Sequence, residues 1–154
     1  MSVLNPNAAF LKSVLGPAVE KSTGTLAATT VPLFTVAGGL VAVTSIVGDV
    51  TTAITVANSY KLQHNPTAGN TVDIVTATDI GTTDSPAGTV LGFKGSDSSI
   101  IGIGAAGSDA AQGLTSPLIL SEGQIESVSA GTDGVINWIV TWVPLQDGAT
   151  LVAA

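Results

Sequence analysis

One stretch near the end of the chain is apolar on both faces of an extended strand, and it constrains the fold more than any other feature. Residues Gly134–Leu145 read GVINWIVTWVPL, contain no charged side chain and hold both tryptophans of the sequence. Because side chains alternate along a strand, one face carries Ile136, Trp138, Val140 and Trp142. Most of the other face is apolar too, which predicts a strand inside a sheet that is covered on both sides. We expect Trp138 and Trp142 to anchor the core, where each would bury roughly 150–250 Å².

Segments rich in β-branched residues alternate with turn signals along the chain from Val31 onward. The pair Gly48 and Asp49 predicts a turn between two strands, and residues 131–134 predict a hairpin that joins strand 123–129 to the tryptophan-containing strand. Short strands with turns at this spacing are typical of a β-sandwich or a jelly roll. The sequence therefore predicts an all-β fold, with a β-sandwich or jelly-roll-like domain over residues 31–154.

Residues 1–30 follow a less regular pattern, which predicts an N-terminal arm. Asn5 and Pro6 can begin a short helix, because Asn is a favoured N-cap and Pro is favoured at the first helical position. An apolar stripe at helical spacing follows, made of Phe10, Leu11, Val14 and Leu15. Two interpretations are open: the stripe plugs one end of its own domain, or it contacts a partner subunit. If it contacts a partner, a chain without residues 1–30 should keep its β-domain folded.

The chain carries little charge for a domain of its size. Charged residues make up 10% of its 154 residues, against about 25% in a typical soluble domain. This is too little to cover the surface of an isolated monomer, so we expect surface to be buried between copies of the chain. The composition favours a homo-oligomer, for which we predict a trimer, over a monomer covered by uncharged polar side chains.

Neither nucleic acid nor a membrane is an expected partner. Four scattered lysines against 11 acidic residues, with a net charge of −7, cannot form a basic patch. The uncharged run Ser22–Gly48 is long enough for a membrane helix, but Pro32 and the pair Gly38 and Gly39 divide it at strand-like intervals. No basic segment precedes the first apolar residues, so we expect no signal peptide.

No catalytic, cofactor or metal site is recognisable in the sequence. His64 is the single histidine; we expect it in a loop, and the chain has no G-x-S-x-G serine for it to activate. The G-x-G-x-x-G match at Gly102–Gly107 lacks the βαβ surroundings of a nucleotide site. The paired carboxylates, which we expect to face solvent, are Asp73 with Asp79 and Glu122 with Glu126. We therefore predict that the protein is not an enzyme and that it has neither a cofactor nor a recognisable metal site. A calcium ion between subunits stays open, because loops that can hold Ca²⁺ contain Asp84, Asp97 and Asp109, although none follows the EF-hand spacing.

Three places in the chain are more distinctive than the rest. The first combines VPLFTVAGG at Val31–Gly39 with IVGDVTTAI at Ile46–Ile54. The second is LQHNPTAG at Leu62–Gly69, and the third is WVPLQDGA at Trp142–Ala149. Together they resemble a family of small virion proteins of tailed bacteriophages. Members of that family have an LQ-x-NPTAG turn and a Y/W-x-PLDDGA motif near the C-terminus. Gln146 stands where that pattern commonly has Asp, a difference that we expect to matter little for the fold.

The resemblance implies a role in head decoration. A protein of this kind is a small β-rich trimer that binds the major capsid protein on the capsid exterior and cements the head without catalysis. The resemblance spans residues 31–154 and does not include the arm. A different binding role stays open, that of a tail fibre or spike component which recognises the host surface. Exposed aromatic side chains would favour that role, and aromatic residues are only 4% of the chain.

Overall fold

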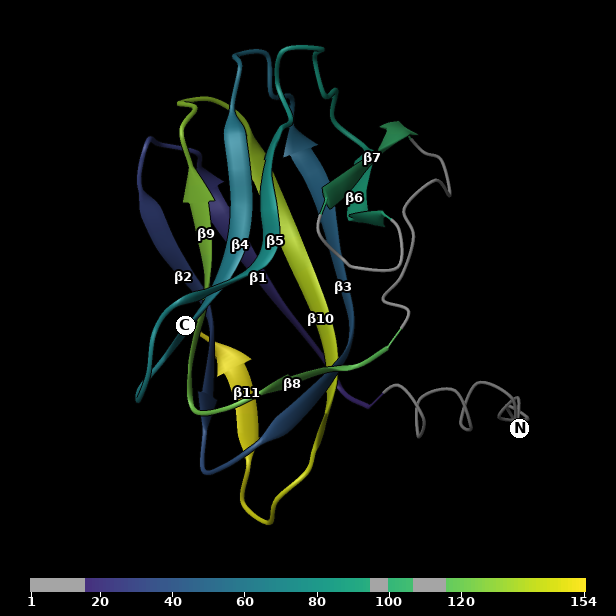
Figure 1. Ribbon diagram of the computed structural model, residues 1–154. Helices are drawn as coiled ribbons and strands as arrows, with labels where there is room; N and C mark the ends of the chain where they lie inside the picture. Colours follow the sequence, from purple (N-terminus) through teal and green to yellow (C-terminus); the bar gives the residue numbers. More distant parts are fainter. Residues whose placement is uncertain (1–15, 95–99, 107–115) are drawn as a thin grey trace, which may run out of the picture.

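The computed structural model describes residues 16–94, 100–106 and 116–154, and within these ranges the chain forms two β-sheets and no helix (Figure 1). Both sheets are built from antiparallel strand pairs, and one parallel pair, Thr76 with Ile100, links their edges. The expected all-β sandwich is therefore confirmed, whereas the jelly-roll arrangement stays a prediction. The described chain has no helix with the length and apolar character needed to cross a membrane.

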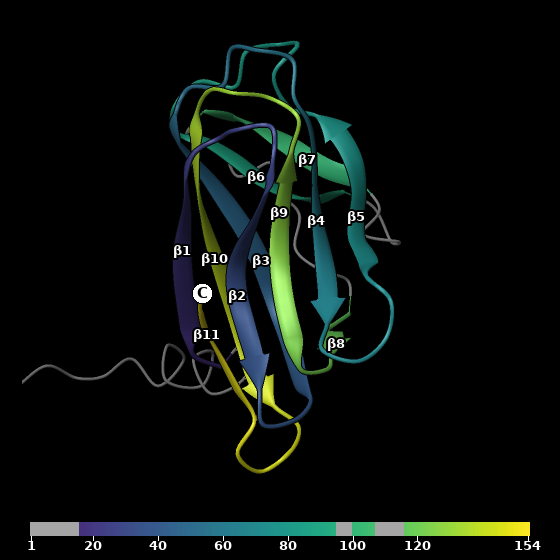
Figure 2. The same cartoon turned by 90° about the vertical axis from the view of Figure 1, so that its left-hand side faces the viewer.

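The tryptophan-containing strand lies in the first sheet, sheet A, next to its edge. In order across sheet A, the strands are β1 (Ala18–Thr25), β10 (Val135–Pro144), β3 (Val41–Thr52), β6 (Thr89–Lys94) and β7 (Ile100–Ala106), and β8 (Leu118–Leu120) pairs with the start of β3. Sheet B consists of β11 (Thr150–Ala153), β2 (Thr30–Ala37), β9 (Gly123–Ser129), β4 (Ser59–Pro66) and β5 (Val72–Asp79). Figure 2 shows β2, β9 and β4 in front of β10 and β3, so the sheets cover each other's inner faces.

The inward side chains of both sheets form one hydrophobic core. Its large, fully buried members include Phe34, Ile46, Ile54, Tyr60, Leu62, Leu91, Ile125, Ile136 and Trp138. Trp138 is 1% exposed and Trp142 is 9% exposed, so both tryptophans lie in the core, as the alternation of β10 predicts. The opposite face of β10 is only half-buried, which corrects the expectation that both faces are covered.

A hydrogen bond between two aromatic side chains ties the sheets together inside the core. The indole N–H of Trp138, on β10, donates to the hydroxyl of Tyr60, on β4, over 2.8 Å. The two rings are stacked, with centroids 6.1 Å apart and an interplanar angle of 8°. Burial raises the pKa of Tyr60 above its ordinary value, and the Tyr60 hydroxyl also hydrogen-bonds the side chain of Ser127, on β9. The neutral phenol therefore joins three strands.

The sandwich begins earlier in the chain than the sequence pattern indicates. β1 pairs with β10 over Ala18–Ser22, so the expected arm over residues 1–30 is too long and contains an edge strand of sheet A. This edge strand is largely exposed and has the sequence AVEKSTGT, so it lacks the apolar alternation by which the other strands could be recognised. The short helix expected near Asn5 lies outside the described residues.

Two expected turns are wrong. Residues 123–129 form β9, which pairs with β2 and β4 in sheet B, so residues 131–134 carry the chain between the sheets instead of closing a hairpin. Gly48 lies inside β3, opposite Trp138, and the chain makes no turn there. A Cβ at Gly48 would lie 3.1 Å from the Trp138 ring, so this glycine makes room for the indole.

One end of the sandwich, which we call the β8 end, gathers several strand ends. Here β2, β4 and β10 finish and β3, β5, β9 and β11 begin, toward the bottom of Figure 1. The pairs Pro66 with Gly123 and Pro144 with Val41 hold these strand ends side by side. β1 also begins at this end, beside the last residues of β10.

Candidate interaction surface

Three of the segments that carry the phage-protein resemblance meet at the β8 end. Most of β2 and the turn after it lie in Val31–Gly39. The second part of β4 and the turn after it lie in Leu62–Gly69. The end of β10 and its connection to β11 lie in Trp142–Ala149. Ile46–Ile54 belongs to the same resemblance but runs along β3 toward the opposite end. Segments that lie far apart in the sequence therefore form one rim, and this clustering is a property of the fold.

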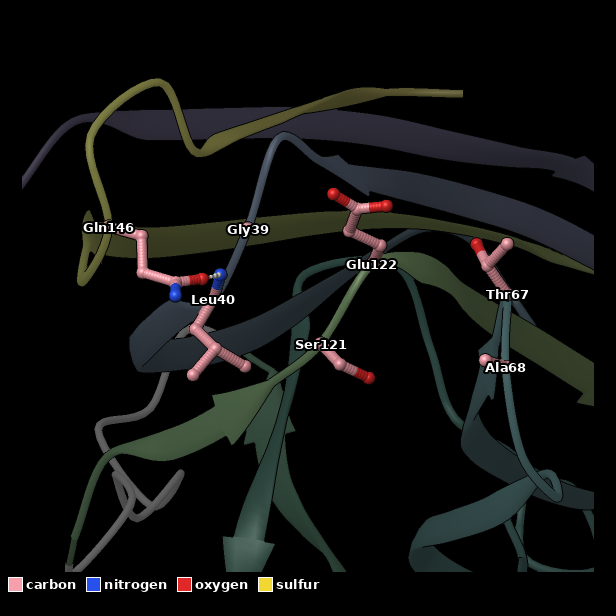
Figure 3. Close-up of a pocket in the computed structure, with 7 residues that line it drawn as sticks. All are labelled: Gly39, Leu40, Thr67, Ala68, Ser121, Glu122 and Gln146. Carbon is pink, nitrogen blue, oxygen red and sulfur yellow. Dashed lines mark hydrogen bonds between the residues drawn. The ribbon is translucent and has the colours of Figure 1, made fainter.

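Hydrogen bonds between the turns fix this rim. The amide of Leu145 donates to the carbonyl of Leu40 over 2.9 Å, and the amide of Thr67 donates to the carbonyl of Glu122 over 2.9 Å. The amide of Leu40 also donates to the side-chain oxygen of Gln146 over 2.7 Å, as drawn in Figure 3. Each turn is thus held by a neighbour from another part of the chain.

Gln146 has a structural role that we did not expect from its departure from the family pattern. Its side chain accepts the Leu40 amide, and its carbonyl accepts the amide of Ala149 over 3.1 Å. Gly39 lies against it with φ of +133°, and a Cβ there would come within 2.6 Å of Gln146 Oε1. A glycine is needed at this position both for its backbone conformation and for the space that Gln146 occupies.

An open depression of about 330 Å³ lies between these turns (Figure 3). Its lining consists of Gly39, Leu40, Thr67, Ala68, Ser121, Glu122 and Gln146. Among the described residues of this lining, Glu122 is the one charged side chain, and it is exposed to solvent. The other lining residues are uncharged, so this part of the lining holds no second titratable side chain beside the carboxylate.

An apolar patch borders the depression on the outer face of sheet A. We call it the β8-end patch, and it consists of Leu40, Ile119, Val143 and Leu145, with the buried Ala42 between Val143 and Ile119. Val143, Ala42 and Ile119 lie opposite one another across β10, β3 and β8. Leu40, Ile119 and Leu145 are 37%, 57% and 50% exposed, respectively. Neighbouring aliphatic side chains exposed in this way make this face a candidate contact surface.

His64 is a strand residue that points into the sandwich, and not the loop residue that we expected. It lies on β4, is 8% exposed, and places its Nε2 atom 3.1 Å from the carbonyl oxygen of Ser121. Burial lowers the pKa of His64 below its ordinary value, which favours a neutral ring that donates from Nε2. His64 therefore holds the segment after β8 against β4 and supports one wall of the depression.

Among the paired carboxylates that we expected to face solvent, Glu126 is buried. It is 7% exposed, and its two oxygens accept hydrogen bonds from Gln63 Nε2 over 2.7 Å and from Asn65 Nδ2 over 3.0 Å. Asp73 is exposed as expected and forms an ion pair with Lys61 at 2.6 Å. Within the described ranges, no three acidic or histidine side chains come together in a way that could hold a metal ion.

The predicted arm contacts lie outside the described residues: Phe10, Leu11, Val14 and Leu15. The described chain begins at Gly16, whose backbone lies directly against β10. A Cβ at Gly16 would come 1.8 Å from the carbonyl oxygen of Trp142 and 2.9 Å from Cγ1 of Val143. The N-terminal segment therefore joins the sandwich at the edge of the β8-end patch.

Comparison of the chain with protein-family models, with curated proteins and with solved structures finds no match. A functional conclusion therefore rests on three features: the resemblance of short segments, the low charge of the chain, and the surface that the fold assembles. The sequence supplies the first two, and the structure supplies the third.

Proposed function

We propose that this chain is a non-enzymatic structural protein of a bacteriophage virion, which decorates the exterior of the capsid. In this role it binds the major capsid protein as a homotrimer and cements the head. One observation carries the proposal: three of the four phage-like segments, which are separated in the sequence, gather around an uncharged patch of exposed aliphatic side chains.

Burial of the β8-end patch between copies of the chain supplies a driving force for the oligomer with which a cement protein binds the head. Apolar surface removed from water contributes roughly 25 cal/mol per Å² and requires no charged partner. A protein that binds only the assembled head also stabilises that head by mass action. Because only 10% of the residues are charged, much of the remaining surface is suited to contacts within an assembly as well.

The alternative role, a tail fibre or spike component that binds the host surface, has weaker support. Sugar recognition favours aromatic side chains that are exposed at loop tips. The aromatic side chains with a described environment are instead buried, with Phe34 and Tyr60 0% exposed, Trp138 1% and Trp142 9%. Binding to host cells, which the tail alternative predicts, is therefore one outcome of the following experiment.

Binding of the purified protein to heads that lack it tests the proposed function. The variant Leu40→Asp with Leu145→Asp places two carboxylates on the patch, and each must be dehydrated when the patch is covered. We expect the amount of protein needed for half-saturation of the heads to rise by at least about tenfold, equivalent to about 1.4 kcal/mol. Co-sedimentation with the heads measures this binding.

A matched control places the same charge elsewhere on the sandwich. Val56 is 47% exposed and lies between β3 and β4, at the end opposite the patch, so Val56→Asp should bind heads like the unmodified chain. If the unmodified protein does not bind heads but binds host cells, the result supports the tail alternative. Equal binding of the patch variant and the control would contradict a role for the patch.

A further inference from the structure

We propose that the β8-end patch and the adjoining depression receive residues 1–15 of a neighbouring copy of the chain. This inference rests on the self-assembly included in the proposed function, and it identifies what covers the patch. Three observations support it: the place where the segment joins the sandwich, its apolar stripe, and its charge.

The attachment of the segment favours exchange between copies. Gly16 has φ of +79°, and its backbone leaves no room for a side chain beside Trp142. This left-handed residue bends the chain away from the extended line of β1. In the sequence the stripe ends at Leu15, directly before this glycine, so no further residues are available as a linker back to its own patch. The segment of a neighbouring copy has no such restraint.

The apolar character of the segment matches that of the patch. The stripe consists of Phe10, Leu11, Val14 and Leu15. A lone helix of about ten residues is marginal in water, so a stripe of this kind needs an apolar surface to be stable. Leu40, Ile119 and Leu145 offer that surface, and neither the stripe nor the patch contains a charged residue.

The charges beside the two surfaces are complementary. Lys12 is the one charged side chain in residues 1–15, and Glu122 is the one charged side chain among the described residues that line the depression. Figure 3 shows the Glu122 carboxylate pointing to the opposite side from the Ser121 hydroxyl, toward the rim formed by the turn after β2. Leu40 points to the other side in this view, so Lys12 meets this carboxylate where the segment crosses the depression between the two side chains.

Engineered cysteines can test the contact directly, because the chain contains no cysteine of its own. Full-length Leu11→Cys is mixed with full-length Ile119→Cys that carries a larger tag, under mild oxidation. We expect a disulfide-linked heterodimer as the main covalent product on a non-reducing gel. In the matched control, Val56→Cys at the opposite end replaces Ile119→Cys, and little heterodimer should form.

A double variant with both Leu11→Cys and Ile119→Cys in one chain distinguishes exchange from folding back. Covalently linked oligomers support exchange between copies. A disulfide confined within single chains overturns the inference, and so does the absence of any disulfide at these two positions.

Self-association of the full chain gives a second readout. Lys12→Glu and Glu122→Lys should each weaken the association constant about threefold, as expected for an exposed ion pair. The double swap should restore it, whereas Asp84→Lys, an exposed position between β5 and β6 at the opposite end, should not rescue Lys12→Glu. Sedimentation equilibrium measures the constant, and no change in either single variant overturns the contact.

Neither experiment uses capsids, so a failure of this inference differs from a failure of the proposed function. If the chain coats heads but does not form the disulfide, the proposed function is supported and the exchange between copies is rejected. If the chain forms the disulfide but is absent from virions, the exchange between copies is supported and the proposed function is rejected.

Discussion

Tyr60 joins the two sheets through a single hydroxyl group. This hydroxyl accepts the indole N–H of Trp138 from sheet A and bonds the side chain of Ser127 in sheet B. Tyr60 and Trp138 are 0% and 1% exposed, so water cannot replace a lost partner. Removing the hydroxyl therefore leaves a buried donor unpaired, which costs free energy beyond the bond itself.

We predict that Tyr60→Phe lowers the free energy of unfolding by about 1–3 kcal/mol. The ring and its stacking on Trp138 remain, so the loss reports the unpaired indole N–H together with the lost bond to Ser127. Urea unfolding followed by tryptophan fluorescence measures the change. In a Trp138→Phe background the same substitution should cost less, because the donor is already gone. An equal cost in both backgrounds would show that the bond contributes nothing.

Burial could be predicted from the sequence for the tryptophans but not for the polar core residues. Trp138 and Trp142 alternate with half-buried residues along one long strand, and alternation alone selects their face. His64 and Glu126 are single polar residues in shorter strands. Their burial depends on partners from remote segments, Ser121 for His64 and Gln63 for Glu126, and the sequence does not show which segments meet.

At the scale of the strands, β1 is the element that carries the N-terminal segment to the β8-end patch. It pairs only with β10, and Thr23 Oγ1 accepts the amide of Ile136 over 3.1 Å. Leu26, directly after β1, is 4% exposed and donates its amide to the carbonyl of Gly134 over 2.9 Å. β1 and Leu26 therefore belong to the sandwich, and the segment available for docking is residues 1–15.

Two truncations should separate these parts of the chain. A chain that begins at Gly16 should keep its free energy of unfolding within about 0.5 kcal/mol of full length, the range of surface changes. Removing residues 1–26 should cost about 3 kcal/mol or more, because it deletes an edge strand and the buried Leu26. Far-UV circular dichroism and urea unfolding measure both. If the shorter truncation also fails to fold, residues 1–15 are part of the core.

Strands with many apolar residues could be predicted from the sequence, but their pairing could not. Segments 123–129 and 134–145 coincide closely with β9 and β10. A tight turn between them looks the same whether it closes a hairpin or carries the chain to the other sheet. Gly48 gives a second example, because a glycine that makes room for the Trp138 ring has the same appearance as a turn glycine.

At the scale of the whole molecule, the fold brings together segments that are far apart in the sequence. The motif segments could be found in the sequence, but their meeting at the β8 end depends on the order of strands in two sheets. The β8-end patch could not be predicted for the same reason, since Leu40, Ile119 and Leu145 come from three separate parts of the chain. Low charge predicts that some surface is covered, and the fold supplies the β8-end patch as the candidate for that surface.

The number and position of copies in the mature particle test the proposed function most directly. Quantitative mass spectrometry of purified virions, calibrated against the major capsid protein, gives the number, and antibody labelling in the electron microscope gives the position. A decoration protein predicts hundreds of copies, distributed over the head. A few copies to some dozens on the tail, or none in the particle, would contradict the account.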